Sequence, residues 1–271
     1  MRYFFHIAYN GHQYHGWQRQ PKHISIQEVI EDCLSRIVKM PTMIMGCGRT
    51  DAQVHASQYF FHADIQEEWH YDFVFRMNKV LPSDIALFNI IPVERNAHAQ
   101  FDAKSRTYDY FIHTYKDPFL TQSSSLYLEK NLRYDLMNEA ANLLTKYNDY
   151  RSFCKSPDQY KHTLCNIKSV QLFSNSNTDR IRIQITADRF LHGMIRAIVA
   201  KLLKIGKGEL SIAEFENYLI KKEMHPNLEF AYPQGLYLSK IIYPYLNIPH
   251  SSSFMDRFKL TPENEWAIVT P

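Results

Sequence analysis

The segment Gly48-Arg49-Thr50-Asp51-Ala52-Gln53-Val54-His55-Ala56 separates two apolar runs, Met43-Ile44-Met45 and Tyr59-Phe60-Phe61. Short apolar runs on either side of a polar segment predict two strands, so this segment is a turn that presents an arginine and an aspartate. Turns held by rigid strands often carry functional side chains. Spacing alone favours a plainer interpretation, in which Asp51 caps the turn and Arg49 pairs with it at the surface.

The composition is typical of a globular protein with one large domain or two smaller ones. Hydrophobic residues make up 45% of the 271 residues and charged residues 22%, which argues against intrinsic disorder. The 31 Lys and Arg residues and 28 Asp and Glu residues give a net charge of only +3. An RNA-binding surface would therefore depend on local clustering of charge.

The cysteines and the apolar runs favour a cytoplasmic protein. None of the four cysteines belongs to a CxxC pair, so we expect thiols that form no disulfide, in a reducing compartment. A structural zinc site from Cys154, Cys165 and His162 is the weaker alternative. The chain begins with a strand pattern rather than a signal peptide, and no apolar run approaches the ~18 residues that span a bilayer.

Residues 1–100 predict the order strand, helix, strand, strand, helix, strand. The expected strands are residues 2–9, 42–48, 57–64 and 85–91. One expected helix starts at Ser25, which forms a capping box with Glu28, and the other starts at Asp72. This order is that of a ferredoxin-like unit.

Residues 101–245 repeat the order with one extra helix. The expected strands are residues 105–115, 167–173, 180–187 and 235–243, and the helices are 136–144, 190–205 and 211–219. We therefore predict an α+β (mixed α/β) fold of two βαββαβ halves, residues 1–100 and 101–245, with a tail, residues 246–271. The halves would join into one extended, mostly antiparallel sheet with helices on one side and a cleft on the other.

A polar loop, residues 12–23, mixes basic and aromatic side chains without a burial period. Arg and Lys contact phosphates, and an aromatic ring can stack on a base. The loop is therefore either an ordered surface loop or an RNA-binding one. Its candidate substrate contacts are Trp17, Arg19 and Lys22.

Three side chains are candidates for chemistry. Asp51 suits a nucleophile, a general base or a metal ligand, but no second carboxylate lies at ligand spacing. Arg49 or Arg196 would keep it ionised. Arg196, at the margin of an apolar helical stripe, either extends to solvent or forms an ion pair. Tyr108 shares a strand face with Tyr110, and such a pair either packs in the core or presents a ring and a hydroxyl to a cleft.

A series of motifs, in chain order, resembles the TruA family of tRNA pseudouridine synthases. The motifs are Tyr9-Asn10-Gly11 with Tyr14-His15-Gly16-Trp17-Gln18-Arg19-Gln20, residues 48–56, Asn78 with Leu81-Pro82-Ser83-Asp84-Ile85, His98-Ala99-Gln100-Phe101-Asp102-Ala103 with Arg106, Tyr108 and Tyr110, Phe190-Leu191-His192 with Met194-Ile195-Arg196, and Gly235-Leu236-Tyr237-Leu238 with Tyr243-Pro244. They cover nearly the whole chain. The chain departs from the family pattern at Gln53, where the family commonly has glycine, and at Cys47 and Gly193.

The resemblance implies an isomerase that converts uridine to pseudouridine at positions 38, 39 and 40, in the anticodon stem-loop of tRNA. It implies a homodimer, no cofactor and no metal, and it makes the expected cleft an RNA-binding one. Asp51 would be the catalytic nucleophile and Arg196 its ion-pair partner. Tyr108 would stack on the base and relay a proton, and Arg49 would hold the base out of the stem. The alternatives are a non-catalytic RNA binder on the same scaffold, a pseudouridine synthase with another RNA target, and a carboxylate-dependent hydrolase.

Overall fold

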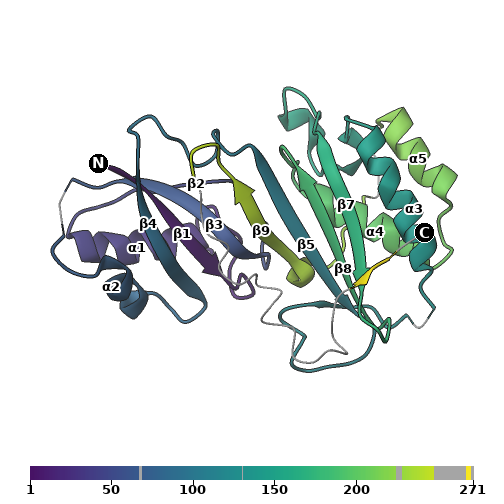
Figure 1. Cartoon of the computed structure of the whole chain (residues 1–271), viewed down its shortest axis with the longest axis horizontal. Coiled ribbons are helices and arrows are strands. Elements are labelled where there is room, and N and C mark those ends of the chain that lie inside the picture. Colours follow the sequence, from purple (N-terminus) through teal and green to yellow (C-terminus); the bar gives the residue numbers. More distant parts are fainter. Residues whose placement is uncertain (67–68, 130, 224–227, 247–266, 270–271) are drawn as a thin grey trace. The chain divides into compact units, whose positions relative to one another are not determined.

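The computed structural model describes residues 1–66, 69–129, 131–223, 228–246 and 267–269 (Figure 1). It divides into two compact units, Met1–Lys104 with Tyr237–Asn247 and Ser105–Leu236 with Ile248–Pro271. The first boundary lies close to the predicted one at residue 100. The strand expected to close the second half, residues 235–243, lies mainly in the first unit instead. Most of the predicted tail, residues 246–271, lies outside the described residues.

The first unit has the predicted order of elements. They are β1 (Arg2–Tyr9), α1 (Ile26–Val38), β2 (Met45–Gly46), β3 (His55–Asp64), α2 (Phe73–Val80) and β4 (Ile85–Val93). β9 (Leu236–Ile242) adds a further strand, so that the sheet order is β9-β3-β1-β4, with β2 also paired to β3. β1 is antiparallel to β3 and β4, and β9 is parallel to β3.

The helices of the first unit begin where the sequence predicts. Asp72 accepts a hydrogen bond from the backbone N–H of Phe75 (2.9 Å), and Ser25 accepts one from that of Glu28 (3.3 Å). These caps satisfy amide groups that have no partner inside the helix. The Glu28 carboxylate lies 3.5 Å from the Arg19 guanidinium and forms an ion pair with it at the start of α1.

The sheet of the first unit buries different residues on its two faces. On the helix face, Phe5 contacts the first residue of α2, Phe73. On the other face, His6 stacks on Phe60, and His62 accepts a hydrogen bond from the N–H of Ala99 (3.2 Å). Burial lowers the pKa of each histidine to about 4.

The second unit also packs helices against a sheet. Its elements are β5 (Ser105–His113), β6 (Ser125–Leu126), α3 (Tyr134–Leu143), β7 (Ile167–Ser174), β8 (Arg180–Ala187), α4 (Met194–Gly206), α5 (Ile212–Lys221) and β10 (Ala267–Ile268). The sheet order is β10-β7-β8-β5, and β6 pairs with β5. Both units thus have the predicted mixed α/β class, with strands that pair mostly antiparallel.

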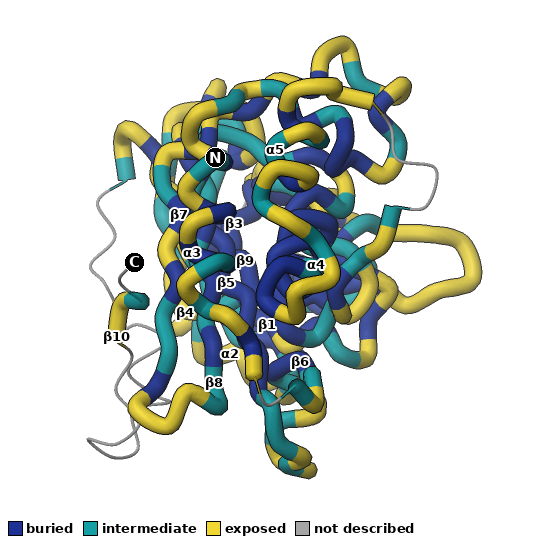
Figure 2. Tube along the Cα trace, turned by 90° about the vertical axis from the view of Figure 1, so that its right-hand side faces the viewer, coloured by how far each residue is buried: buried dark blue, intermediate teal, exposed yellow. Residues whose placement is uncertain are grey.

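β2 and the start of α4 differ most from their predicted ranges. β2 contains only Met45–Gly46 rather than residues 42–48, because its pairing with β3 is confined to two positions. α4, which is buried along most of its length (Figure 2), begins at Met194 rather than at residue 190. Gly193 has a φ of +74°, which is incompatible with an α-helix, so the helix starts after it.

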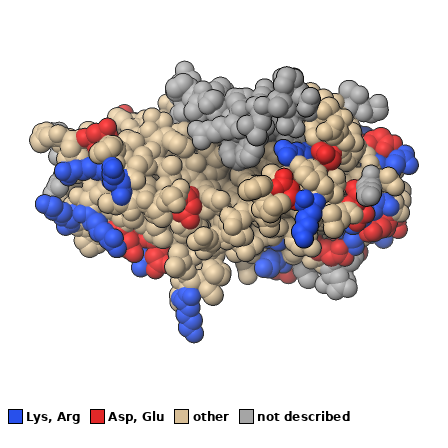
Figure 3. All heavy atoms as spheres, turned by 90° about the horizontal axis from the view of Figure 1, so that it is seen from below, with Lys and Arg blue, Asp and Glu red and all other residues tan. Residues whose placement is uncertain are grey.

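The helices and the surface charges bear on whether the chain crosses a membrane or binds a polyanion. No helix in the described part of the chain is both long and apolar enough to cross a membrane. On the face that Figure 3 shows, Lys and Arg side chains lie beside Asp and Glu side chains. On this face, binding of a polyanion would therefore rely on selected positions.

The buried His6 predicts how stability depends on pH. The unfolded chain protonates His6 near pH 6.5, whereas the folded chain does so only near pH 4. The stability contributed by neutral His6 is therefore complete above pH 6.5 and is lost as the pH falls toward 4, by up to about 3 kcal/mol. We expect His6→Phe, which keeps a ring beside Phe60, to flatten this loss in urea denaturation between pH 4 and 6.5. The exposed His70→Asn is the control, and equal slopes for the two variants would contradict the prediction.

Candidate active site

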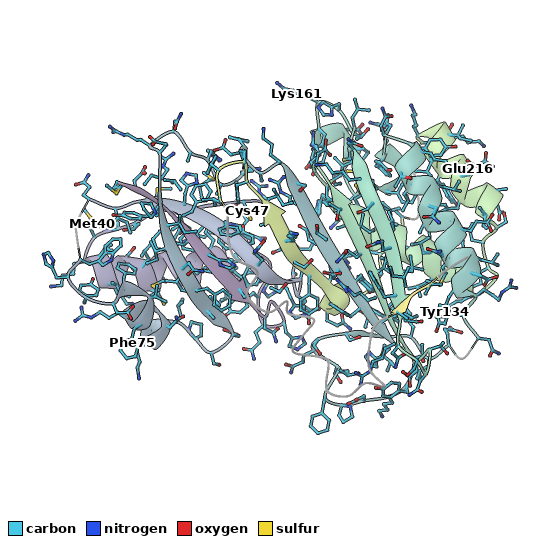
Figure 4. The ribbon with its side chains drawn as sticks, viewed as in Figure 1. Met40, Cys47, Phe75, Tyr134, Lys161 and Glu216 are labelled. Atoms are coloured by element: carbon cyan, nitrogen blue, oxygen red, sulfur yellow. The ribbon has the colours of Figure 1, made fainter. Side chains whose placement is uncertain are left out.

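The signature loop, residues 47–54, joins β2 to β3 and carries two of the predicted site residues. Arg49 is exposed, Asp51 is half-buried, and Thr50 between them is buried. Cys47, labelled in Figure 4, donates its backbone N–H to the carbonyl of Phe60 (2.8 Å). The loop therefore starts from the pairing of β2 with β3, with Thr50 in the core, Asp51 half-buried and Arg49 at the surface.

Residues 11–17 form a cradle for the signature loop. The N–H of Trp17 donates to the carbonyl of Thr50 (3.1 Å), and the N–H of Gln53 donates to the carbonyl of Tyr14 (3.0 Å). The hydroxyl groups of Thr50 and Tyr9 lie 2.9 Å apart. Most of these contacts use backbone groups, so they fix the position of the loop without occupying its charged side chains.

Two glycines of the cradle permit this close approach. A Cβ atom at Gly11 would lie 2.0 Å from the carbonyl oxygen of Val54, and one at Gly16 would lie 2.4 Å from that of Thr50. Gly16 also has a φ of +87°, which favours glycine. A larger residue at either position would displace the backbone that carries Asp51.

Trp17 supports the signature loop from the core. Its ring stacks on that of Tyr59 in β3, with 4.1 Å between ring centroids, and Tyr59 donates a hydrogen bond to the carbonyl of Gly48 (2.5 Å). We expected Trp17 to contact the substrate, but only 2% of its surface is exposed. The ring is enclosed by those of Tyr9, Tyr59 and Phe61, so Trp17 is a supporting residue rather than one that stacks on a base.

A second group of hydrogen bonds ties the cradle to the turn before β4. Asp84 accepts a hydrogen bond from the hydroxyl of Tyr14 (2.7 Å), and its carbonyl accepts one from the N–H of Asn10 (2.8 Å). Burial and the neighbouring carboxylate raise the pKa of Tyr14 above its usual range. Asn78 makes two hydrogen bonds with the backbone of Leu87 (2.7 and 2.8 Å). These motif residues therefore build the scaffold of the loop.

His55, at the start of β3, is also part of this scaffold. Its Nδ1 accepts a hydrogen bond from the N–H of Gly11 (3.0 Å), and its ring stacks on that of Tyr237 in β9, 4.5 Å away. Because both contacts are buried, His55 joins the cradle to the strand that returns from the end of the chain.

Arg19 and Lys22 lie on the exposed part of the loop that continues from the cradle. The Arg19 guanidinium is 3.2 Å from the Glu31 carboxylate and 3.5 Å from that of Glu28. Lys22 is exposed and has a φ of +71°. Arg19 itself is half exposed, whereas the Glu31 carboxylate is largely buried and that of Glu28 is half-buried. The exposed side of the Arg19 guanidinium is the part that could reach a phosphate. Substrate contacts by these two residues stay a prediction.

Tyr108 lies in β5 opposite Ile185 of β8, with 9% of its surface exposed. Its ring meets that of Phe190 edge-on, with 5.2 Å between ring centroids. Tyr110, on the same strand face, is fully buried and donates a hydrogen bond to the carbonyl of Tyr232 (2.7 Å). Tyr110 is therefore the core residue of the pair.

Arg196 lies in the first turn of α4 and is half-buried. Its Nε donates a hydrogen bond to the carbonyl of Ala231 (2.7 Å), and its guanidinium lies over the ring of Phe230, 5.6 Å from the centroid. Asp51 belongs to the first unit, whereas Tyr108 and Arg196 belong to the second. The pairing of Asp51 with Arg196 stays a prediction.

Comparison with known proteins agrees with the motifs. A family model described as tRNA pseudouridine synthase matches residues 140–244. The chain is 40% identical over 246 residues to the tRNA pseudouridine synthase A of Porphyromonas gingivalis, covering 90% of this chain and 97% of the relative. The chain belongs to the tRNA pseudouridine synthase A family. Other family members named tRNA pseudouridine synthase A are 42% identical in Azobacteroides pseudotrichonymphae and 34% identical in Shewanella piezotolerans, over 90% of this chain and 97% and 94% of theirs.

Sequence reasoning missed most of the scaffold in this tRNA pseudouridine synthase A family member. Gly11, Gly16 and Tyr14 belonged to a quoted motif, but nothing in their spacing indicated that they contact residues 50–54. The alternative zinc site does not form, because Cys154 and Cys165 are buried whereas His162 is exposed. The described residues contain no group of three His, Cys, Asp or Glu side chains that could hold a metal.

The backbone of the signature loop predicts the effect of one substitution. Gln53 has a φ of +63°, a left-handed conformation that costs an L-residue about 1 kcal/mol. Gln53→Gly removes this strain but frees the unfolded chain, so we expect the free energy of unfolding to rise by about 0.5 kcal/mol in urea denaturation. Gln13→Gly, at an exposed position without a positive φ, is the control and should lower it. A loss of stability in both variants would rule out strain at Gln53.

Proposed function

We propose that this protein isomerises uridine to pseudouridine in the anticodon stem-loop of tRNA, with Asp51 as the nucleophile. Membership of the tRNA pseudouridine synthase A family supports the reaction and the isomerase class. The observation that carries the role of Asp51 is the signature loop, because it holds a half-buried carboxylate on a backbone cradle. A residue held in this way meets the need for accurate placement at a reacting centre.

The reaction breaks the N1–C1′ bond, turns the uracil and forms a C5–C1′ bond. The proton on C5 is lost and N1 gains one, so the composition of the nucleoside is unchanged. An ionised carboxylate can add to the ring, attack C1′ or remove a proton from C2′. Each of these steps requires a charged Asp51 at a site that excludes water.

The second unit would supply the other two groups. Arg196 would pair with Asp51 and keep it ionised, because a guanidinium favours the charged form of a neighbouring carboxyl group. Tyr108 would stack on the uracil and relay the C5 proton through its hydroxyl. The N-terminal unit thus carries the nucleophile, and the C-terminal unit carries the tyrosine and the arginine. The family resemblance also supports a cytoplasmic homodimer.

Arg49 would act before the chemistry. The target base must leave the stem, at a cost of a few kcal/mol, and a base pair at the loop end of a stem is a cheaper target than one in its middle. Arg49 is exposed and lies two residues before Asp51, so its side chain can fill the space that the base vacates. This contact would offset part of the cost of flipping.

Substitution of Asp51 tests the proposed reaction. We expect Asp51→Ala to lower pseudouridine formation on an unmodified tRNA transcript by at least about a thousandfold while leaving tRNA binding within about twofold. Pseudouridine mapping after incubation without added cofactor gives the product, and a filter-binding assay gives the affinity. Asp32→Ala, which removes an exposed carboxylate from α1, is the control. A fully active Asp51→Ala enzyme would refute the mechanism, and an inactive wild-type protein that still binds tRNA would favour the non-catalytic RNA binder.

Substitution of Arg49 tests the flipping role. We expect Arg49→Ala to slow single-turnover conversion of a paired stem uridine by about tenfold, because the vacated space is left unfilled. On a transcript whose target uridine is mismatched, the cost of flipping is already reduced, so the variant should approach the wild-type rate. Arg36→Ala on α1 is the control. Equal slowing on paired and mismatched transcripts would show that Arg49 acts in another step.

A further inference from the structure

The segment before β9 forms a strap, residues 228–232, that is fixed to the second unit at both ends. At one end, the Glu229 carboxylate pairs with Lys204 of α4 (2.7 Å). At the other end, the N–H of Tyr232 donates to the hydroxyl of Tyr127 (3.2 Å), and its carbonyl accepts the hydroxyl of Tyr110 (2.7 Å). Because the ion pair of Glu229 is exposed, the hydrogen bonds of Tyr232 are the stronger attachment of the strap.

The middle of the strap contacts Arg196 in three ways. The N–H of Ala231 donates to the carbonyl of Arg196 (3.0 Å), and the carbonyl of Ala231 accepts the Nε of Arg196 (2.7 Å). The guanidinium also lies over the ring of Phe230, within the range of a cation–π interaction. A hydrogen bond at Nε and a ring against the guanidinium together restrict the direction in which a long side chain points.

Gly193 provides the space that Phe230 occupies. A Cβ atom at Gly193 would lie 2.6 Å from Cε1 of Phe230 and 3.2 Å from its Cδ1. Gly193 is also the N-cap of α4, where it has a left-handed conformation, and it lies one turn before Arg196. The residue that begins the helix and the residue that covers the arginine therefore fit each other.

We propose that Phe230 is a positioning residue for Arg196 and that Gly193 is required because it makes room for the Phe230 ring. This inference rests on the proposed role of Arg196 as the partner of Asp51. A carboxylate is held well only when the planar guanidinium faces it in one orientation. The strap holds the guanidinium in one orientation within the second unit, and the ring of Phe230 is its side-chain component.

Single-turnover kinetics on an unmodified tRNA transcript test the effect on the reaction. We expect Phe230→Leu to lower the rate of pseudouridine formation by about tenfold, with the KM for tRNA within about twofold, because the ring acts on orientation rather than on RNA binding. Phe230→Tyr keeps the ring and should restore at least half of the wild-type rate. Phe119→Leu, at a largely exposed phenylalanine of the same unit, is the control for loss of an aromatic residue.

Two double variants show whether the residues act through one another. Gly193→Ala should slow the reaction by at least a similar factor, because it displaces the ring and also strains a residue with a φ of +74°. In a Phe230→Leu background only the backbone strain remains, so the effect of Gly193→Ala should be clearly smaller there. Phe230→Leu should also add little in an Arg196→Met background. Full additivity in either pair, or a wild-type rate for Phe230→Leu, would overturn the inference.

A measurement that needs no catalysis separates this inference from the proposed function. In ¹⁵N-labelled protein, the Nε–H resonance of Arg196, identified by its loss in Arg196→Met, should be shifted by the ring current of Phe230 and protected from exchange. The ring-current shift should be lost and the protection reduced in Phe230→Leu, and both should be altered in Gly193→Ala, even if the wild-type protein proved inactive on tRNA. If neither substitution changed the chemical shift or the exchange protection of the Arg196 Nε–H, the inference would be overturned whatever the activity of the protein.

Discussion

Residues 11–17 pack directly, backbone against backbone, on the signature loop that carries Asp51. The position of that loop depends on this contact. Gly11 and Gly16 leave less than 2.5 Å between a notional Cβ and the carbonyl oxygens of Val54 and Thr50. The hydrogen bonds to Thr50 and from Gln53 form only because the segments come this close. The aromatic support from Trp17 follows from the same constraint, since its N–H must reach Thr50 while its ring remains in the core.

The two charged groups of the proposed site are held by different physical means. The side chain of Asp51 is short and has few rotatable bonds, so a fixed loop backbone nearly fixes the position of its charged group. An arginine has a long flexible side chain, and fixing the α4 backbone leaves the guanidinium free to take many directions. The contacts from Ala231 and Phe230 remove this freedom at the side chain itself. Most of the motif residues described above therefore position Asp51 or Arg196, and few would take part in making or breaking bonds.

The sequence patterns predicted the elements better than their limits or their contacts. Periodicity and caps identified α1 and α2, because each helix has one buried face and a polar capping residue before its first turn. They placed the start of α4 too early, since an apolar pattern continues through Gly193 although its backbone does not. They also assigned residues 235–243 to the second half, because pairing of β9 with β3 joins residues nearly two hundred positions apart, which no local pattern reports. The burial of Trp17 was missed for a related reason, since its partner Tyr59 lies in another element.

The four cysteines lead to a different kind of consequence. Each is buried and forms no disulfide, with Cys33 and Cys47 in the first unit and Cys154 and Cys165 in the second. Burial raises the pKa of Cys165 to about 12 and raises that of Cys33 and Cys154 as well, so these native thiols are both hidden and protonated at neutral pH. Alkylating reagents react with thiolates that reach solvent, and their rate of reaction at each cysteine therefore reports how often the structure around it opens. The chain thus carries two natural reporters of local opening in each unit, without any introduced label.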